Sequence, residues 1–280
     1  MLWEGRQITM TPMIPTFLYG TAWKEDDTER CVRLAIEAGF RGIDTANQRR
    51  HYFEAAVGAA VKASGVSREQ LFLQTKFTYI DSQDHRLPYD PNADVAMQVR
   101  QSFASSLEHL QVDAIDSYVL HGPSRRHGLS QDDLDVWRAM EELHDAQKTR
   151  FLGVSNVALD QLELLCAEAR VQPRFVQNRC FARTMWDRDV RRFCRARGIV
   201  YQGFSLLTAN VAELRTRAFR EIVERTGMTP AQVVFCFAQQ VGMLPLTGTT
   251  DPSHMREDLA AERFELSADD LRLMETIAQA

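Results

Sequence analysis

The chain has 280 residues, of which 45% are hydrophobic and 25% are charged, as in an ordinary globular protein. Its net charge of −5 argues against a polyanion-binding surface, so we expect no nucleic-acid partner. No stretch approaches the roughly 20 apolar residues that span a bilayer, and the N-terminal residues show no secretory signal pattern. We therefore expect a cytoplasmic protein with no membrane partner.

The cysteines and histidines show no pattern of a structural cross-link or a metal centre. The five cysteines are scattered and include no C-x-x-C pair, which excludes a disulfide framework or a zinc knuckle. The seven histidines include no H-x-H or H-E-x-x-H pattern, so we expect no metal. A reducing compartment is consistent with this cysteine usage.

Short apolar runs alternate with amphipathic segments along the chain, and both can be followed in chain order. The runs expected to be strands are Phe17–Ala22, Gly42–Asp44, Leu71–Phe77, Ile115–Leu120, Phe151–Val154, Phe175–Val176, Ile199–Phe204 and Met243–Leu246. The segments expected to be helices are Asp27–Ala38, Glu54–Ala63, Val95–Leu110, Asp132–Ala146, Leu159–Glu168, Arg188–Arg197, Arg217–Thr226, Pro230–Val241, His254–Ala261 and Leu266–Ala278.

Eight consecutive βα units predict an α/β protein whose parallel sheet closes into a (β/α)8 TIM barrel with an extra C-terminal helix. A barrel of this kind needs about 250 residues, so we expect one domain over residues 1–280. An open doubly wound sheet is less favoured because no G-x-G-x-x-G motif occurs.

Polar residues end several of the expected strands. Barrel enzymes carry their chemistry at the carboxyl ends of the strands, where the βα loops meet. Each residue alone has a structural explanation: Asp44 can cap a helix, His121 can be a satisfied core histidine, and Lys76 can extend to solvent. Their convergence on one face indicates an active site instead. The residues at these positions are Asp44, Lys76, His121, Ser155, Asn156, Gln177 and Ser205.

Tyr52, in the loop after the second expected strand, can supply a proton donor to the same face. A free tyrosine has a pKa of about 10 and is a poor acid at neutral pH. We expect the Lys76 ammonium to lower the pKa of Tyr52, and the Asp44 carboxylate to keep Lys76 charged and oriented. His121 would position a carbonyl group or share the proton.

From Gly20 to Leu259 the sequence resembles the aldo-keto reductase superfamily. The matching segments, in chain order, are GTAWK, GFRGIDTA, EAAVG, LFLQTKF, DAIDSYVLHGP, FLGVSN, VQN, GFS and TGTTDPSHMRED. The resemblance implies a catalytic tetrad of Asp44, Tyr52, Lys76 and His121, and an NADPH molecule bound in an extended conformation across the barrel mouth.

The resemblance also assigns residues to the cofactor and the substrate. Ser155, Asn156 and Gln177 would bind the nicotinamide carboxamide, and Phe204 would stack on the nicotinamide ring. The other cofactor residues it implies are Thr21, Asp44, Ser205, Leu207, Gly248, Thr249, Thr250, His254 and Asp258. Trp23, with Tyr52 and His121, would line the substrate pocket. Tyr79 precedes a segment that is either a substrate-facing loop or a surface excursion.

The sequence departs from the family pattern in three places. The segment from Asp44 to EAAVG is two residues longer than usual, and Phe53 replaces an asparagine. At the 2′-phosphate position Gly248 and His254 replace a lysine and an arginine, and Asp258 replaces an adenine-binding asparagine. Charge-assisted hydrogen bonds contribute about 1.5–3 kcal/mol each, so NADPH is expected while NADH or dual use stays open.

We therefore expect an NADPH-dependent aldo-keto reductase, a monomer, that transfers a hydride to a small-molecule carbonyl substrate, an aldehyde or a ketone, while Tyr52 donates the proton. Two alternatives remain at this point. The barrel can have been adapted to imine or alkene reduction or to a biosynthetic tailoring step, or the chain can be a cofactor-binding regulatory subunit.

Overall fold

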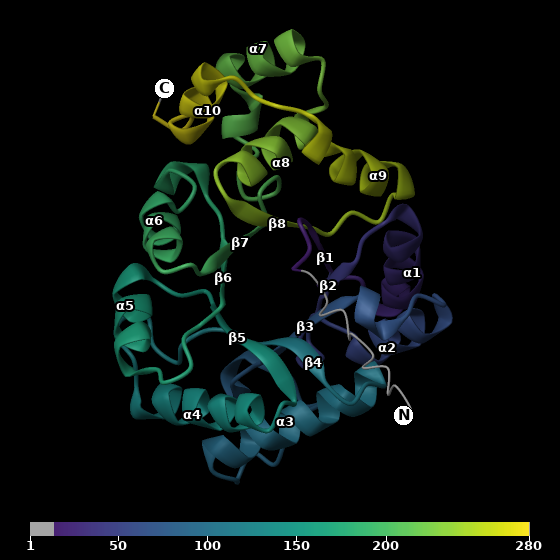
Figure 1. Ribbon diagram of the computed structural model, residues 1–280, viewed down its shortest axis with the longest axis vertical. Coiled ribbons are helices and arrows are strands. Elements are labelled where there is room, and N and C mark those ends of the chain that lie inside the picture. The colour runs from purple at the N-terminus through teal and green to yellow at the C-terminus, as the bar shows by residue number, and fades with distance from the viewer. Residues whose placement is uncertain (1–13, 280) are drawn as a thin grey trace, which may run out of the picture.

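In the computed structural model, which describes residues 14–279, eight parallel strands close into a barrel with helices around it (Figure 1). Each strand pairs with the next in sequence, and β1 pairs with β8 to close the ring. The strands are β1 Leu18–Gly20, β2 Gly42–Asp44, β3 Phe72–Phe77, β4 Ile115–Leu120, β5 Thr149–Ser155, β6 Phe175–Arg179, β7 Val200–Phe204 and β8 Met243–Thr247. The predicted (β/α)8 barrel is confirmed.

The helices lie outside the barrel, and two of them follow β7. They are α1 Thr28–Ala38, α2 Glu54–Ala63, α3 Val95–Leu110, α4 Gln131–Asp145, α5 Leu159–Glu168, α6 Arg188–Ala196, α7 Arg217–Thr226, α8 Pro230–Gln240, α9 Pro252–Ala260 and α10 Ala268–Glu275. The expected extra helix is α10, which packs against α7 (Figure 1). It begins later than predicted because the Ser267 side chain caps its first turn.

Local sequence explains where these elements begin and end. Helix α1 buries Val32, Ala35 and Ile36 on one face and ends at Gly39, whose φ of 118° is easily adopted only without a side chain. Strands β5 and β6 are longer than the apolar runs that predicted them. Ser155, which ends β5, and Gln177, within β6, pair through the backbone, which an apolar pattern does not reveal.

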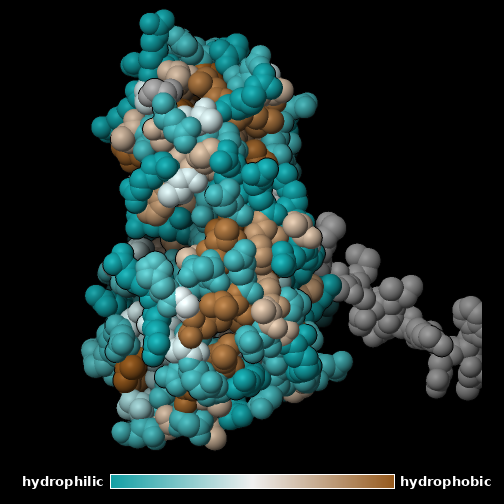
Figure 2. All heavy atoms as spheres, turned by 90° about the vertical axis from the view of Figure 1, so that its left-hand side faces the viewer, coloured by the Kyte–Doolittle hydropathy of each residue, from teal (hydrophilic) through white to brown (hydrophobic). Residues whose placement is uncertain are grey.

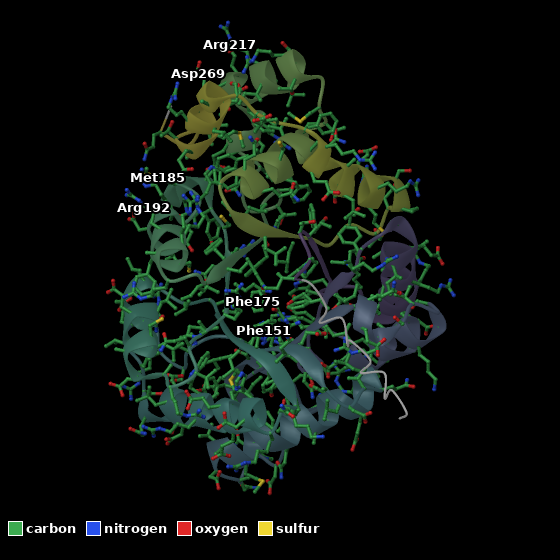
Figure 3. All side chains as sticks on the ribbon, viewed as in Figure 1. Phe151, Phe175, Met185, Arg192, Arg217 and Asp269 are labelled. Atoms are coloured by element: carbon green, nitrogen blue, oxygen red, sulfur yellow. The ribbon has the colours of Figure 1, made fainter. Side chains whose placement is uncertain are left out.

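The barrel interior changes from apolar to polar along the strands, as β3 shows with Phe72, Gln74 and Lys76. At the amino-terminal end, the rings of Phe151 and Phe175 lie inside the ring of strands with centroids 5.6 Å apart (Figure 3). They belong to a small buried cluster with Leu18, Phe72, Leu244 and Leu246. The polar side chains are thereby concentrated at the carboxyl end.

The outside of the barrel carries no single distinguishing feature on the side formed by α5 and α6, where hydrophobic patches alternate with hydrophilic side chains (Figure 2). All five cysteines are free, and Cys166 on α5 is partly exposed while the other four are buried. Membrane-spanning helices and metal-binding clusters are both absent from the described residues. Within residues 14–279 no helix is long and apolar enough to cross a bilayer. The same range contains no group of three or more side chains placed to hold a metal ion.

Two expectations lie at least partly outside the described residues. The N-terminal segment in which we found no secretory signal falls almost entirely within residues 1–13. That residues 1–280 form a single domain stays a prediction.

Candidate active site

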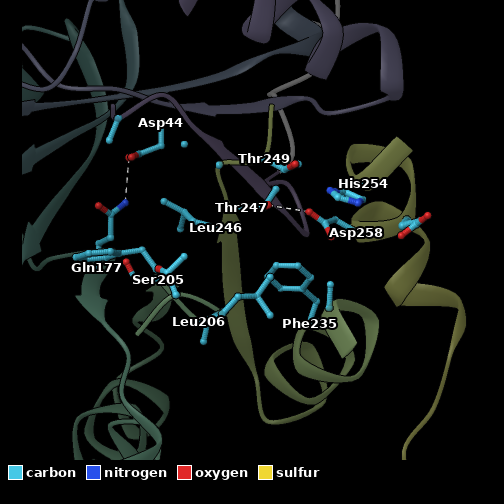
Figure 4. Close-up of a pocket in the computed structure, with 18 of the residues that line it drawn as sticks. Asp44, Gln177, Ser205, Leu206, Phe235, Leu246, Thr247, Thr249, His254 and Asp258 are labelled. Carbon is cyan, nitrogen blue, oxygen red and sulfur yellow. Dashed lines mark hydrogen bonds between the residues drawn. The ribbon is translucent and has the colours of Figure 1, made fainter. Parts of the chain in front are cut away.

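A cavity of about 760 Å³ opens at the carboxyl ends of the strands. Asp44, Gln177 and Ser205 lie on one side of it, and His254 and Asp258 lie on the opposite side, with Leu246 and Thr247 between them (Figure 4). The remaining wall comes from the loops after the strands and from α8. A cavity of this size falls in the range of small-molecule and cofactor sites, which is roughly 300–1,000 Å³.

The centre of the site is an ion pair between Asp44, at the end of β2, and Lys76 of β3. The Lys76 Nζ lies 2.7 Å from each Asp44 carboxylate oxygen and donates a third hydrogen bond to the Thr45 carbonyl at 2.8 Å. Both side chains are almost fully buried. Burial lowers the pKa of Lys76, while the Asp44 carboxylate opposes that shift and supports the charged ammonium.

Tyr52 reaches this pair from a turn in the loop after β2. The Tyr52 and His51 amides both donate to the Gln48 carbonyl, at 3.0 and 3.3 Å, and α2 begins at Glu54. The Lys76 Nζ lies 5.4 Å from the centroid of the Tyr52 ring. Tyr52 also lines the cavity, so this loop places a phenol at the site.

The pKa of Tyr52 shifts in the direction opposite to our expectation. Burial raises the pKa of the phenol, and the Asp44 charge raises it further. Lys76, which we expected to lower this pKa, is itself bonded to Asp44 at 2.7 Å. The phenol therefore keeps its proton at neutral pH, as a general acid must before the reaction.

His121, after β4, faces the same part of the cavity with its ring centroid 5.9 Å from that of Tyr52. Its Nδ1 shares a hydrogen bond of 2.7 Å with the Thr78 hydroxyl, and its carbonyl accepts from Asn156 at 2.8 Å. Burial, and then the charges of Lys76 and His51, lower the pKa of His121 to about 3. The imidazole is therefore neutral at physiological pH.

The side chains expected at the nicotinamide line the next part of the cavity. Ser155 donates to the Gln177 carbonyl at 2.7 Å, and Gln177 donates to Asp44 at 3.0 Å. Asn156 and Ser205 have positive φ angles of 51° and 56°, which turn the chain sharply where each strand ends. Phe204, Ser205 and Leu207 also line the cavity.

The far end of the cavity contains Gly248, Thr249, His254 and Asp258. The Thr247 hydroxyl donates to Asp258 at 2.7 Å, and burial raises the pKa of this carboxyl to about 6 (Figure 4). Thr250 is not part of this wall.

Lys24, from the loop after β1, lies behind the glycine at the far end. Its side chain is buried, and its Nζ donates to the Gly248 carbonyl at 2.6 Å. A β-carbon added to Gly248 would lie 3.5 Å from this Nζ. Within residues 14–279 no carboxylate forms a salt bridge with Lys24. The Nζ also lies 5.4 Å from the centroid of the Tyr19 ring, and burial lowers the pKa of Lys24.

Three other expected site residues lie away from the cavity wall. Thr21 is fully buried and donates to the Asp44 carbonyl at 3.0 Å. The Tyr79 hydroxyl donates to Asp133 at 2.8 Å, which turns it toward the start of α4. Trp23 is 71% exposed, and its ring stacks on His51 at 3.8 Å, beside the cavity.

A sequence profile of the aldo/keto reductase family matches residues 16–279. The chain belongs to the aldo/keto reductase family. It is 30% identical over 260 residues to the glyoxal reductase of Bacillus subtilis (strain 168), covering 92% of this chain and 87% of that protein. It is 28% identical over 293 residues to the glycerol 2-dehydrogenase (NADP(+)) of Saccharomyces cerevisiae, covering 95% and 88%. The crystal structure of an aldo/keto reductase from Brucella melitensis superposes with a TM-score of 0.80 at 26% identity, covering 94% and 95%.

As an aldo/keto reductase, the protein is an oxidoreductase of carbonyl compounds, and the family uses a nicotinamide cofactor. The cavity contains further residues that the sequence did not single out. Thr229, Pro230, Ala231 and Phe235 bring the first turns of α8 into its wall, and Glu257 joins the far end. The dipeptide Thr229-Pro230 marks a helix start in the sequence, but nothing local shows that this helix faces the site.

Proposed function

We propose that this aldo/keto reductase reduces a small aldehyde or ketone to an alcohol with NADPH, and that Tyr52 donates the proton. The observation that carries the proposal is the buried Asp44–Lys76 pair beside a cavity lined by Tyr52 and His121. Charged pairs this deeply buried are costly unless their hydrogen bonds are complete, so they commonly mark functional sites.

The described residues suit a bound dinucleotide. The cavity extends from Tyr52 and His121 past Gln177 to Thr249 and His254, so it is long enough to have distinct ends. The side chains at one end are amides and hydroxyls, which match a carboxamide. When bound there, the nicotinamide supplies the hydride that reduces the carbonyl carbon.

The protein's own residues manage the proton. The raised pKa of Tyr52 keeps the phenol protonated until charge develops on the substrate oxygen. As the proton leaves, the Lys76 ammonium, 5.4 Å from the ring centroid, stabilises the phenolate that forms. Asp44 holds Lys76 in place, and the neutral His121 can donate a hydrogen bond to the same oxygen.

NADPH rather than NADH is supported by Lys24. Its ammonium occupies the space next to Gly248, where the chain has no side chain of its own. An anionic group near Thr249 and His254 would neutralise this buried cation and so relieve its cost. The similarity to an enzyme named for NADP(+) points in the same direction.

The names of the relatives guide the choice of substrate. Proteins named glyoxal reductase and methylglyoxal reductase are 29–30% identical to this chain. Small aldehydes are therefore the first class to assay, with imines and activated alkenes in the same panel to reveal a barrel adapted to other reductions.

We also propose that the protein acts as a monomer in the reducing cytoplasm. The proposed catalytic residues and the cavity come from one chain, and all five cysteines are free thiols. Sedimentation equilibrium tests the monomer: a stable dimer at micromolar concentration would contradict it.

The central experiment combines cofactor binding with one matched pair of variants. NADPH and NADH are titrated in parallel while intrinsic tryptophan fluorescence is followed, and aldehyde turnover is then measured. Tyr52→Phe should lower kcat by about a thousandfold and leave the Kd for NADPH within about twofold. Tyr118→Phe removes a buried phenol from outside the cavity and should leave kcat unchanged.

The turnover measurement and the cofactor titration test different parts of the proposal. Retained turnover in Tyr52→Phe would refute Tyr52 as the proton donor. Binding of neither cofactor by the wild-type protein would refute the reductase itself.

A further inference from the structure

Three glutamines form a buried layer directly beneath the Asp44–Lys76 pair. Gln74 on β3, Gln177 on β6 and Gln202 on β7 are each at most 3% exposed. Strand register sets Asp44 beside Gln74 and Gln177 beside Gln202, and hydrogen bonds among the three amides bring these two pairs together. The level below is apolar, and barrel interiors are usually filled by branched aliphatic residues. Filling space therefore does not explain three amides here.

Gln74 and Gln177 each donate one hydrogen bond to Asp44 and a second one to Gln202. The Gln74 Nε2 donates to Asp44 Oδ1 at 2.7 Å and to Gln202 Oε1 at 2.8 Å. The Gln177 Nε2 donates to the same two oxygens at 3.0 and 2.9 Å. With Lys76, the carboxylate accepts four hydrogen bonds, which compensates a charge that is otherwise costly to bury.

Gln202 sets the orientation of the other two amides. Its Oε1 accepts from both neighbours, and its Nε2 donates to Gln74 Oε1 at 3.0 Å. If either neighbour turned its amide over, a carbonyl oxygen would face both Gln202 Oε1 and the Asp44 carboxylate. Among the described residues, the Gln202 side chain forms hydrogen bonds with these two glutamines and with none of the four proposed catalytic residues.

We propose that Gln74 and Gln202 are positioning residues of this active site, which fix the Asp44 carboxylate and through it the Lys76 ammonium next to Tyr52. The inference rests on the proposed function and deepens it. Gln177 is shared between the layer and the cavity wall, so one amide joins the proposed cofactor pocket to the catalytic pair.

The glutamine layer lies next to several ionisable side chains that influence one another. Lys76 faces Asp44 and, at longer range, Glu54 of α2. His121 responds to Lys76 and to His51, and Tyr52 responds to Asp44. The glutamines add no charge to this set but hold its negative member with dipoles. Loss of one amide should therefore change the pH at which the set exchanges protons, as well as its geometry.

The test uses Gln202 because this residue contacts Asp44 only through Gln74 and Gln177. Gln202→Leu deletes the amide that orients Gln74 and Gln177. We expect kcat to fall by about tenfold and the pH midpoint of kcat to shift by about half a unit. The Kd for NADPH should stay within about twofold.

Gln202→Glu provides a nearly isosteric second variant. When protonated, its carboxyl can donate to Gln74 Oε1 as the amide does, so kcat at low pH should match that of the wild type. Once ionised, it places a second anion beside the layer. The variant should therefore show a new ionisation in its kcat–pH profile and a thermal midpoint that falls as pH rises.

Gln161→Leu is the matched control. Gln161 is equally buried, but its amide bonds only backbone groups, at Ala158, Arg125 and Gly128. It should lower thermal stability and leave the kcat–pH profile unchanged.

The possible outcomes separate this inference from the proposed function. A Gln202→Leu variant with wild-type kcat and pH profile would overturn the inference while the reductase stands. If that variant does not fold, a Gln202→Glu profile without a new ionisation overturns it equally. A wild-type protein that turns over no carbonyl compound overturns the proposed function instead.

Discussion

The two ends of the main cavity are built differently. At the catalytic end, Asp44, Lys76 and three buried glutamines form a hydrogen-bonded set in which every charge has several partners. At the far end, Asp258 accepts from one hydroxyl, Lys24 contacts one carbonyl and the Tyr19 ring, and Gly248 offers no side chain. The comparison indicates that proton transfer needs catalytic side chains held in one arrangement by many hydrogen bonds. The residues at the far end have fewer partners, so substitutions there can alter which cofactor binds without disturbing the catalytic residues.

The largest expected effect comes from the fixed end. Lys76→Met leaves the Asp44 carboxylate buried without its cation, so unfolding should become easier by about 3–5 kcal/mol. It also removes the charge beside Tyr52, and kcat should fall by about a thousandfold. Thermal unfolding and aldehyde turnover measure the two effects. Lys62→Met, which changes an exposed lysine, is the control, and equal effects of both variants would contradict the proposed role.

The second prediction concerns cofactor choice at the far end. Lys24→Met should raise the Kd for NADPH by about tenfold and change the Kd for NADH by less than about twofold, because only NADPH carries the 2′-phosphate. Fluorescence titration with both cofactors measures the ratio. Lys148→Met changes a lysine exposed at the start of β5 and should alter neither value. Parallel weakening of both cofactors would show that Lys24 does not discriminate between them.

The third prediction uses the pKa of Asp258, which burial raises to about 6, above the usual range of an aspartate. In the folded protein the carboxyl favours its proton, so the contribution of Asp258 to stability is fully present below about pH 4 and is lost as pH rises through about 6. Asp258→Asn should therefore stabilise the protein by roughly 2–3 kcal/mol at pH 8. Chemical denaturation at pH 8 and pH 4 checks this. A benefit that is the same at both values would refute the assignment.

The smallest expected effect belongs to Trp23, which is 71% exposed and stacks on His51 outside the fixed end. Trp23→Ala should raise KM for bulky aldehydes by a few-fold and leave kcat and thermal stability nearly unchanged, since little buried contact is lost. Steady-state kinetics with one small and one bulky aldehyde measure the difference. A thermal midpoint lowered by several degrees would mean that the tryptophan is a structural residue.

Much of the fold and part of the site could be predicted because the signals are local. Alternating apolar runs gave the barrel, and the polar ends of β2, β3 and β4 gave Asp44, Lys76 and His121. The turn before α2 places Tyr52 at the same cavity, and its role as the proton donor stays a prediction.

The remaining features depend on residues far apart in the chain. Gln74 and Gln202 are separated by 128 positions, and Lys24 and Gly248 by 224, so neither contact leaves a local pattern. The pKa of Tyr52 was misjudged in direction because the sequence shows that a lysine is near but not that burial outweighs it. The part of α8 in the cavity wall follows from packing alone.

The five cysteines can be used to measure unfolding of the barrel by thiol labelling, because they differ in exposure. Cys166 on α5 is partly exposed, whereas Cys31, Cys180, Cys194 and Cys236 are buried, and burial raises the pKa of Cys180 and Cys194 to about 12. In the native state an alkylating reagent can therefore reach one thiol on the outer surface, far from the proton chemistry. Labelling of the other four follows only local or global unfolding, so the number of modified thiols over time measures how often the barrel opens.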